Sequence, residues 1–247
     1  NYPPYDKLEG AICFAKDLVN YLSFFYHKLH SKPYDKKSLY WYYALRDVFE
    51  RKYIHFDFSN LSCKKAIICN VSKIDTQEIM SHFPGVSFLE FKHDTQTLIS
   101  NQYETPATLG LDRLAAANGA EIIAPKKNKL IIDLGTAITI DFVDKDANYI
   151  GGNISVGMSS RFKALHDYTQ NLPLLSPTEK TKLTGKNTIE AIQNGVIIGI
   201  CNEIDGYIKS YSSIYQDITT FLTGGDCLFF EKRVKKSIIK NDKERNT

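Results

Sequence analysis

Hydrophobic positions along the chain are most regular near its middle, where two short apolar runs flank a glycine. Leu130–Ile132 forms the first run, and Ala137–Val143, which is rich in β-branched residues, forms the second. Runs of this length and composition predict β-strands, and Gly135 between them predicts a tight bend. We therefore expect a β-hairpin in this part of the chain, with a second turn at Gly151 and Gly152 at its far end.

Segments that predict strands and helices alternate on both sides of this hairpin. Alternation of this kind is typical of an α/β fold. The strand-like segments are Lys65–Val71, Ser87–Phe91 and Phe221–Thr223, the last leading into a glycine turn that ends at Asp226, and the helix-like segments are Thr76–His82, Gly157–Leu165 and Ile189–Ile208, the last with Thr188 as its expected cap.

Residues 1–59 have a different pattern that is rich in aromatic side chains. Ala11–Leu29 and Leu39–Phe49 carry apolar residues at helix-like spacing, so they predict two helices. The aromatic residues of the second helix can form a base-stacking or peptide-binding face, although core packing is the commoner cause of such clusters. No glycine occurs between Gly10 and Gly85, so a phosphate-cradling loop, which depends on glycine, is not expected in that interval.

Composition and charge narrow the classes of function. The 247 residues carry a net charge of only +3 with acids and bases interleaved, so no strong field favours nucleic acid as a partner. The basic end, Phe230–Thr247, is also interrupted by acids and is expected to be a solvated tail. The apolar runs are far too short to span a bilayer, and no signal-peptide pattern opens the chain, so we expect a cytoplasmic protein without a membrane partner. Its five scattered cysteines predict free thiols.

The bend of the hairpin is the first candidate site. Gly135 lets the backbone approach a bulky anion, and Thr136 adds a hydroxyl donor. Asp133, just before the bend, adds a carboxylate that can hold a cation. The pattern D-x-G-T also occurs in ordinary hairpins, so a purely structural bend is the alternative.

The segment Tyr103–Arg113 is the second candidate site. Phosphorylation of an alcohol requires a group that accepts the hydroxyl proton, and a substrate that carries a carboxylate also requires a positively charged side chain to bind it. Asp112 can supply the first and Arg113 the second, at the start of a helix over Leu114–Gly119, while Gly110 allows a close approach by the substrate. The alternative is a helix cap with a surface ion pair.

Together with Gly185–Gly195 and Leu222–Asp226, these segments occur in an order and at separations that closely resemble the type III pantothenate kinases, members of the acetate and sugar kinase/Hsc70/actin superfamily. The resemblance covers roughly Lys65–Asp226. It implies two RNase H-like α/β domains, at residues 1–114 and 115–247, with a nucleotide cleft between them. It also implies a homodimer that uses ATP to phosphorylate pantothenate to 4′-phosphopantothenate, the first step of coenzyme A biosynthesis.

The same resemblance implies roles for individual residues. Asp112 would be the catalytic proton acceptor, and Thr188 would reach the substrate across the subunit interface. The residues implied to bind substrate are Tyr103, Gly110, Leu111, Asp112, Arg113 and Thr188, those implied to bind ATP are Gly135 and Thr136, and the one implied to hold a monovalent cation, K⁺ or NH₄⁺, is Asp133. Mg²⁺ would arrive mainly with the nucleotide.

Two alternatives remain open at this point. The family opens with a strand and a D-x-G-N-T-type phosphate turn, and neither this turn nor the family's closing segment is recognisable here. This observation favours a catalytically inactive homologue or fragment that binds pantothenate or a protein partner without turnover. Another kinase or phosphatase of the superfamily is the more distant alternative, since related folds host unrelated activities, but the Gly110–Arg113 motif argues against it.

Overall fold

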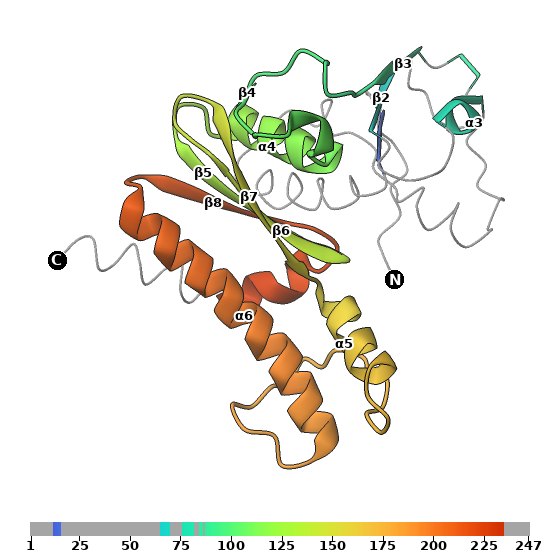
Figure 1. Ribbon diagram of the computed structural model, residues 1–247, viewed down its shortest axis with the longest axis vertical. Helices are drawn as coiled ribbons and strands as arrows, with labels where there is room; N and C mark the ends of the chain where they lie inside the picture. The colour runs from blue at the N-terminus through green and yellow to red at the C-terminus, as the bar shows by residue number, and fades with distance from the viewer. Residues whose placement is uncertain (1–11, 16–64, 70–75, 82–83, 86, 235–247) are drawn as a thin grey trace.

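The strands within the described residues form two separate sheets. The computed structural model describes residues 12–15, 65–69, 76–81, 84–85 and 87–234 (Figure 1). Among these residues, a three-stranded parallel sheet has the order β1-β2-β3, and a five-stranded mixed sheet has the order β4-β7-β6-β5-β8. The α/β class predicted from the sequence is therefore confirmed, while the division into domains at residues 1–114 and 115–247 stays a prediction.

The smaller sheet follows the predicted strand–helix–strand pattern. Strand β2 (Lys65–Cys69), helix α3 (Thr76–Ser81) and strand β3 (Ser87–Glu90) lie within a residue or two of the expected segments. The two strands pair in parallel, with Lys65 opposite Ser87. Parallel neighbours need a crossover connection, and the segment that contains α3 provides it.

The predicted helix at Ala11–Leu29 is wrong at its start. Ile12–Ala15 forms strand β1, which pairs in parallel with β2. Four consecutive apolar residues do not distinguish a helix from a buried strand by periodicity, and pairing with a neighbouring strand decides between them. The rest of that prediction, and the second helix predicted at Leu39–Phe49, lie outside the described residues.

The larger sheet is built on the predicted hairpin, which is confirmed. Its three central strands form an antiparallel meander, in which Leu134 lies opposite Ile138 across the bend. A fourth strand then returns in parallel beside the first, and a two-residue strand covers the opposite edge. The strands are β4 (Ser100–Asn101), β5 (Asn128–Leu134), β6 (Ala137–Val143), β7 (Asn148–Val156) and β8 (Ile218–Thr223).

The second turn lies earlier in the chain than the sequence predicts. Gly151 and Gly152 lie inside β7, opposite Phe142 and Asp141. The turn is made instead by Asp144, whose Oδ1 accepts hydrogen bonds from the backbone N–H groups of residues 146 and 148 at 2.9 and 2.8 Å. Aspartate side chains commonly organise turns in this way, so an aspartate rather than a glycine pair determines where the strand reverses.

Helices cover both faces of the larger sheet (Figure 1). Helix α4 (Leu111–Ile123) packs on one face, where it buries Ile131 of β5. Helices α5 (Met158–Asp167) and α6 (Thr188–Ile214) pack on the other face. Alternate residues of a strand point to opposite faces, which explains the continuous apolar run of β5. A short 3₁₀ turn, η3 (Pro106–Thr108), leads into α4.

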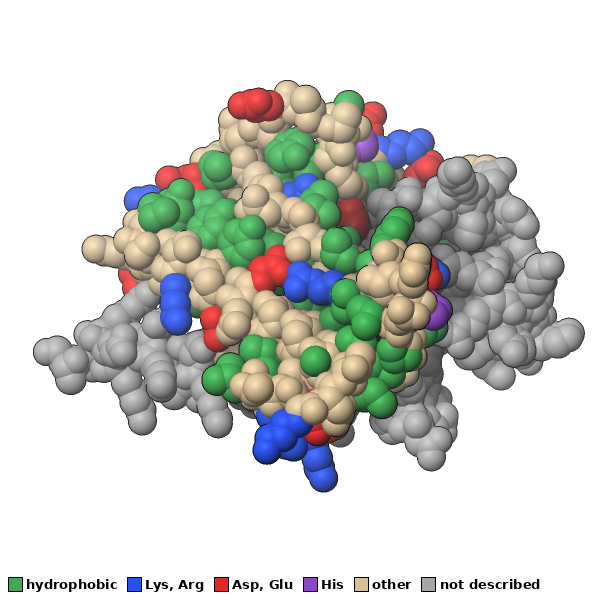
Figure 2. Space-filling view, turned by 60° about the horizontal axis from the view of Figure 1, so that its bottom comes forward, with side chains coloured by type: hydrophobic (Ala, Val, Ile, Leu, Met, Phe, Trp, Pro, Cys, Tyr) green, Lys and Arg blue, Asp and Glu red, His purple; other side chains and the backbone are tan. Residues whose placement is uncertain are grey.

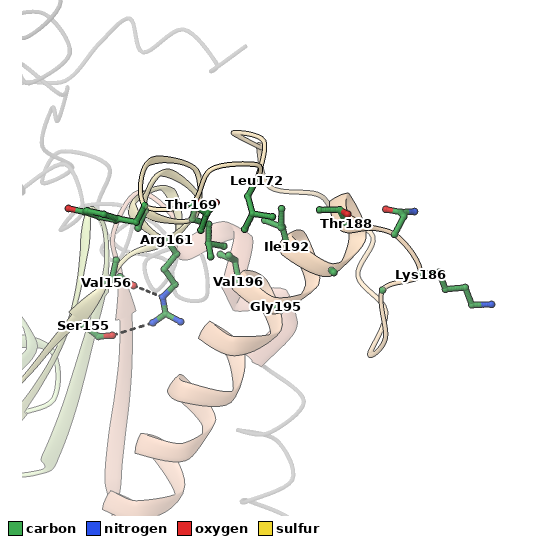
Figure 3. A pocket seen from close by; sticks show the side chains of 16 residues that line it. Ser155, Val156, Arg161, Thr169, Leu172, Lys186, Thr188, Ile192, Gly195 and Val196 are labelled. Carbon is green, nitrogen blue, oxygen red and sulfur yellow. Dashed lines mark hydrogen bonds between the residues drawn. The ribbon is translucent and has the colours of Figure 1, made fainter.

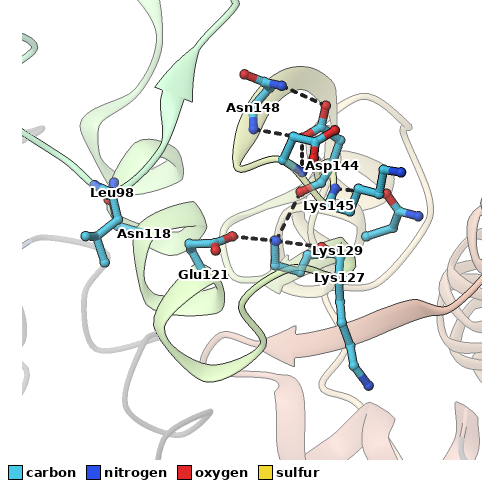
Figure 4. Close-up of polar contacts among 10 residues, drawn as sticks. Leu98, Asn118, Glu121, Lys127, Lys129, Asp144, Lys145 and Asn148 are labelled. Atoms are coloured by element: carbon cyan, nitrogen blue, oxygen red, sulfur yellow. Dashed lines mark hydrogen bonds and ion pairs between the residues drawn. The ribbon is translucent and has the colours of Figure 1, made fainter.

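Two buried ion pairs fasten α4 to the sheet at different points. Near the end of the helix, Glu121 Oε2 lies 2.5 Å from the fully buried Lys129 Nζ (Figure 4). The ammonium group also donates to the carbonyl oxygens of Lys127 at 2.6 Å and Asp144 at 3.1 Å, so several acceptors surround its charge. Near the start of the helix, Arg113 forms the second pair, with a residue of β6.

Helix α6 begins at Thr188, just before the predicted start at Ile189, and Asn187 caps it in place of the predicted Thr188. The Oδ1 of Asn187 accepts the N–H of Glu190 at 2.9 Å, and Glu190 Oε2 accepts the N–H of Lys186 at 2.9 Å. This exchange resembles a capping box and satisfies donors that the helix itself leaves open. Although α6 has 27 residues, no helix within the described residues has the length and apolarity needed to cross a membrane.

The start of the predicted C-terminal tail is wrong, because it belongs to the core. Residues 227–234 are helical, and Phe230 and Val234 are fully buried in the same cluster as α5 and α6. Their spacing of four residues places both on one helix face, which the basic composition of this segment obscures in the sequence. The remaining residues, 235–247, lie outside the described part of the chain.

Candidate functional site

The start of α4 carries the predicted proton acceptor. Gly110 is the N-cap residue and Asp112 lies in the first turn, where its Oδ1 accepts the N–H of Arg113 at 2.9 Å. A β-carbon at Gly110 would come within 2.3 Å of that carboxylate oxygen. Glycine is therefore needed here to give the Asp112 carboxylate its position, and Leu111 beside it packs against the core of the α4 face.

Arg113, whose positive charge is predicted to bind the carboxylate of the substrate, is part of a buried hydrogen-bonded group. Its Nε and Nη2 donate to Asp141 Oδ1 at 2.9 and 2.6 Å, and the hydroxyl of Tyr149 donates to the same oxygen at 2.6 Å. The Arg113 side chain is 6% exposed and that of Asp141 is fully buried. The alternative of a surface ion pair at this helix start is therefore wrong.

The charges in this group support one another. Burial works against the charged guanidinium, but the hydrogen bonds and attraction of Asp141 outweigh it and raise the pKa of Arg113 above its usual range. Burial raises the pKa of Asp141, against the hydrogen bonds from Arg113 and Tyr149 that favour the carboxylate. Burial and the Asp141 charge also raise the pKa of Tyr149, so its hydroxyl keeps its proton and donates it. Three donors on one oxygen favour the charged form of Asp141 and oppose the effect of its burial.

Tyr103 lies beside this group, as a substrate-binding role at Arg113 requires. Its ring centroid is 5.7 Å from Arg113 Cζ and 6.2 Å from the ring centroid of Tyr149, in an edge-to-face arrangement. A β-carbon at Gly152 would come within 2.2 Å of the carbonyl oxygen of Ile140, 2.5 Å of Asp141 Oδ1 and 2.9 Å of Arg113 Nη2. This glycine therefore makes room for the backbone of β6 and for the ion pair, which explains its presence inside a strand.

Sequence reasoning missed Asp141 and Tyr149 as members of the site. The signal for Asp141 is its position in the middle of the apolar strand β6, because a charge in a buried strand requires a partner. No signal in the local sequence identifies Tyr149, which reaches the carboxylate from the neighbouring strand.

The predicted nucleotide residues lie at one end of the larger sheet. Gly135 and Thr136 form the bend between β5 and β6, and the carbonyl of Thr136 accepts the N–H of Gly157 at 3.0 Å. A second glycine turn lies against the same strand end, because the N–H of Asp226 donates to the carbonyl of Leu134 at 2.9 Å. The structure thus brings two glycine turns, separated by about ninety residues of chain, to the same end of the sheet.

Asp133 lies at the same end of the sheet, among hydroxyl-bearing residues. Across the sheet it is paired with Thr139 on β6 and with Thr223 on β8. Hydroxyl and carboxylate oxygens are ligands that hard cations accept. No cluster of three or more His, Cys, Asp or Glu side chains that could hold a metal occurs in the described part of the chain, so a cation at Asp133 would also need hydroxyl, carbonyl or nucleotide oxygens.

The two candidate segments point to the same end of the sheet. Glu121, late in α4, reaches Lys129 near the start of β5, whereas Arg113, at the start of α4, reaches Asp141 beside Ile131. The helix therefore runs opposite to β5, and its first turn is directed toward the end at which the two glycine turns meet. The predicted proton acceptor, Asp112, and the turn at Gly135 therefore lie on one side of the fold.

Thr188 lies elsewhere, in a groove on the α5 and α6 side of the molecule (Figure 3). The groove has a volume of about 1140 Å³, and its lining includes Val156, Leu172, Ile192 and Val196. It shares no lining residue with the segment from Tyr103 to Arg113. Within one described chain, Thr188 therefore lies apart from the other residues that are predicted to bind substrate.

Apolar side chains are exposed around this groove. Figure 2 shows the end of the molecule that carries α5, where hydrophobic patches alternate with charged side chains. Arg161 stabilises the groove wall by donating from Nε to the carbonyl of Val156 at 2.8 Å and by pairing with Glu203 of α6. The side chains that are about half exposed or more in this region are Ile154, Val156, Tyr168, Leu174, Leu183 and Ile189.

Asp226 makes the stability of the fold depend on pH. Burial raises the pKa of this carboxyl to about 6. A carboxyl whose pKa is higher in the folded than in the unfolded state stabilises the fold fully below the unfolded value, about 4, and this contribution is lost as the pH rises through about 6. Because Asn keeps the shape and capping ability of Asp, we expect Asp226→Asn to raise the free energy of unfolding at about pH 7.5 by about 1–2 kcal/mol, after allowance for partial exposure.

Urea denaturation of both proteins at about pH 7.5 and about pH 4 measures this effect, with the difference expected to disappear at the lower value. A difference of the same size at both pH values would contradict ionisation of Asp226 as the cause.

Comparison with known proteins places the chain in a family. The family model described as type III pantothenate kinase matches residues 30–210. The type III pantothenate kinase of Flavobacterium johnsoniae is 40% identical over 180 residues, which are 73% of this chain and 74% of that protein. That of Christiangramia forsetii is 40% identical over 201 residues, or 79% and 83% of the two chains. The chain belongs to the type III pantothenate kinase family.

The type III pantothenate kinase match spans every predicted site residue from Tyr103 to Thr188, and it ends before β8 and Asp226. Among solved structures, a putative Baf family transcriptional activator from Campylobacter jejuni aligns with a TM-score of 0.47 and 21% identity, covering 80% of this chain and 88% of that one. The family assignment rests on the sequence matches alone.

Proposed function

We propose that this chain is an active type III pantothenate kinase, which transfers the γ-phosphate of ATP to the 4′-hydroxyl of pantothenate. The product, 4′-phosphopantothenate, is the first intermediate of coenzyme A biosynthesis. The observation that carries the proposal is the direction of α4, whose first turn, with Asp112, points to the sheet end where the turns at Gly135 and Gly224 meet. Phosphoryl transfer requires this proximity between an alcohol activator and a phosphate site.

Asp112 takes the proton of the attacking hydroxyl in this mechanism. A carboxylate in the first turn of a helix is favoured by the helix dipole and is directed outward from the helix end. Arg113 and Tyr103 line the substrate pocket, where the guanidinium hydrogen-bonds the carboxylate of pantothenate. Gly110 keeps the Asp112 carboxylate in place, because any larger residue would displace it.

The nucleotide lies at the glycine turns in this mechanism. Gly135 offers backbone, and Thr136 offers an exposed hydroxyl, to the phosphates of ATP. Mg²⁺ neutralises charge on the transferred group and arrives with the nucleotide. Asp133, with the hydroxyls of Thr139 and Thr223 next to it in the sheet, would hold the monovalent cation, K⁺ or NH₄⁺. The two RNase H-like domains with the cleft between them are part of this proposal.

A homodimer completes the substrate site in this proposal. Thr188 is distant from the start of α4 within one chain but lies in a groove bordered by exposed apolar side chains. Such surfaces are typical of protein interfaces. A second copy of the chain that covers this surface would carry its own Thr188 toward the neighbouring substrate pocket.

Ile189→Glu is expected to disrupt this dimer. Ile189 is 51% exposed and lies in the first turn of α6, where a glutamate does not oppose the helix dipole but would be buried without a partner in the interface. We expect a monomer with kcat/KM for pantothenate lowered by about tenfold or more, measured by analytical ultracentrifugation and a coupled kinase assay. Ile122→Glu, at a position that is 62% exposed on α4, is the matched control and should stay dimeric and active. Dissociation by both variants or by neither would contradict this surface as the interface.

The decisive experiment for the function is detection of the product. The protein is incubated with ATP, Mg²⁺, K⁺ and pantothenate, and mass spectrometry is used to detect 4′-phosphopantothenate. Product formation that requires each component is the expected result. Folded protein that binds pantothenate but makes no product would establish the alternative, an inactive homologue. Location in the cytoplasm stays a prediction.

A further inference from the structure

We propose that Asp141 is a positioning residue, which orients the guanidinium of Arg113 toward the carboxylate of the substrate. The inference rests on the proposed function, because it requires a substrate with a carboxylate at Arg113. It assigns a role to Asp141, a residue on a sheet strand far from Asp112 in the sequence.

The geometry fixes one edge of the guanidinium. Asp141 Oδ1 accepts hydrogen bonds from Nε and from Nη2 of Arg113, at 2.9 and 2.6 Å. Nη1 is therefore the nitrogen that the carboxylate does not occupy and the one that can be presented to a ligand. An arginine side chain has many rotamers, and a partner that holds two of its three nitrogens removes most of that freedom before the substrate binds.

Asp141 is itself held in place by Tyr149 on the neighbouring strand. The hydroxyl of Tyr149 donates to its Oδ1 at 2.6 Å, and Gly152 leaves the space in which carboxylate and guanidinium meet. The Asp141 side chain is fully buried, so water does not compete for these bonds. A rigid supporting residue behind a ligand-binding side chain is the arrangement that precise orientation requires.

The second ion pair of α4 shows how a purely structural pair differs. Glu121 and Lys129 are also buried, on the same helix–sheet interface, but Lys129 is surrounded by backbone carbonyls near the far end of the helix (Figure 4). Arg113, in contrast, is adjacent to Asp112 and lies beside the ring of Tyr103. The two pairs therefore offer a matched comparison within one interface.

The expected effect is a loss of preference for the carboxylate of the substrate. Asp141→Asn keeps the size of the side chain but removes the charge that holds Arg113. We expect the KM for pantothenate to rise about tenfold or more, with the KM for ATP within about twofold of wild type. Tyr149→Phe keeps both charges of the ion pair but removes one hydrogen bond that holds Asp141. We therefore expect the KM for pantothenate to rise by about threefold in this variant.

The test measures the dissociation constants of pantothenate and of its neutral alcohol analogue, in which CH₂OH replaces the carboxylate, by titration calorimetry. Wild type should prefer the acid, Asp141→Asn should lose at least about nine-tenths of that preference, and Glu121→Gln should keep it. A preference in Asp141→Asn equal to that of wild type, or equal losses in Asp141→Asn and Glu121→Gln, would overturn the proposal.

Folding of each variant is checked by circular dichroism. If Asp141→Asn does not fold, Tyr149→Phe decides the matter, because an unchanged preference in that variant also overturns the proposal. Failure of the proposed function is seen separately, as wild-type protein that neither binds pantothenate nor forms the phosphorylated product.

Discussion

Asp112→Asn is expected to lower kcat for pantothenate phosphorylation by about 10²- to 10⁴-fold, the contribution usual for a positioned general base. Asparagine has the shape of aspartate and can still accept the N–H of Arg113 through its side-chain oxygen, the bond that Asp112 makes at 2.9 Å. The helix start should therefore keep its structure. Steady-state kinetics give the loss in kcat, and thermal unfolding should show a midpoint close to that of wild type.

A second aspartate on a helix serves as the control. Asp167, the last residue of α5, makes a surface ion pair with Lys163 at 2.6 Å. Such pairs contribute little to stability, so Asp167→Asn should leave both kcat and the unfolding midpoint near the wild-type values. Substantial turnover by Asp112→Asn would exclude Asp112 as the base, whatever its position in the fold.

Lys129→Met is expected to lower the free energy of unfolding by about 3–5 kcal/mol. The side chain of Lys129 is fully buried, and its ammonium group lies 2.5 Å from Glu121 Oε2. Removal of the lysine leaves the Glu121 carboxylate and two carbonyl oxygens without their donor in a site that water does not reach freely. Urea denaturation, monitored by circular dichroism, measures the loss.

The double variant Lys129→Met with Glu121→Leu tests the cause of that loss. When both charges of a buried pair are replaced by apolar side chains, most of the stability usually returns. We therefore expect the double variant to be clearly more stable than Lys129→Met alone. If the double variant instead loses as much stability as Lys129→Met and Glu121→Leu lose separately and in sum, the cost lies in packing rather than in the unpaired charge.

The parts of the fold that could be predicted are those whose signal is local. The hairpin around Gly135 and the helix that begins at Thr188 follow from runs of apolar residues and from helix-capping residues, so their positions are close to those expected. The short apolar run at Ile12–Ala15 carries no such signal, and pairing with β2 determines its structure. The buried position of Phe230 likewise depends on contacts with helices far away in the sequence.

The same distinction applies to the candidate site. Gly110 and Asp112 flank Leu111 in the sequence, which predicts both as site residues, and the structure adds only that one makes room for the other. Asp141 and Tyr149 join Arg113 through the pairing of β6 with β7 and the packing of α4, which a single sequence does not reveal. Residues that support a site from neighbouring strands are therefore the ones that sequence reasoning misses.

The close meeting of Arg113, Asp141 and Gly152 restricts how this protein can change over evolution. A β-carbon at residue 152 would come within 2.2 Å of the backbone carbonyl oxygen of Ile140, 2.5 Å of Asp141 Oδ1 and 2.9 Å of Arg113 Nη2, so a side chain there would displace the backbone of β6 as well as the ion pair. Glycine should therefore persist at residue 152, while substitutions of Arg113 and Asp141 should be inherited as a pair. In lineages that have exchanged the buried arginine for a neutral residue, the aspartate loses its reason to persist and should be free to vary, whereas the glycine should remain.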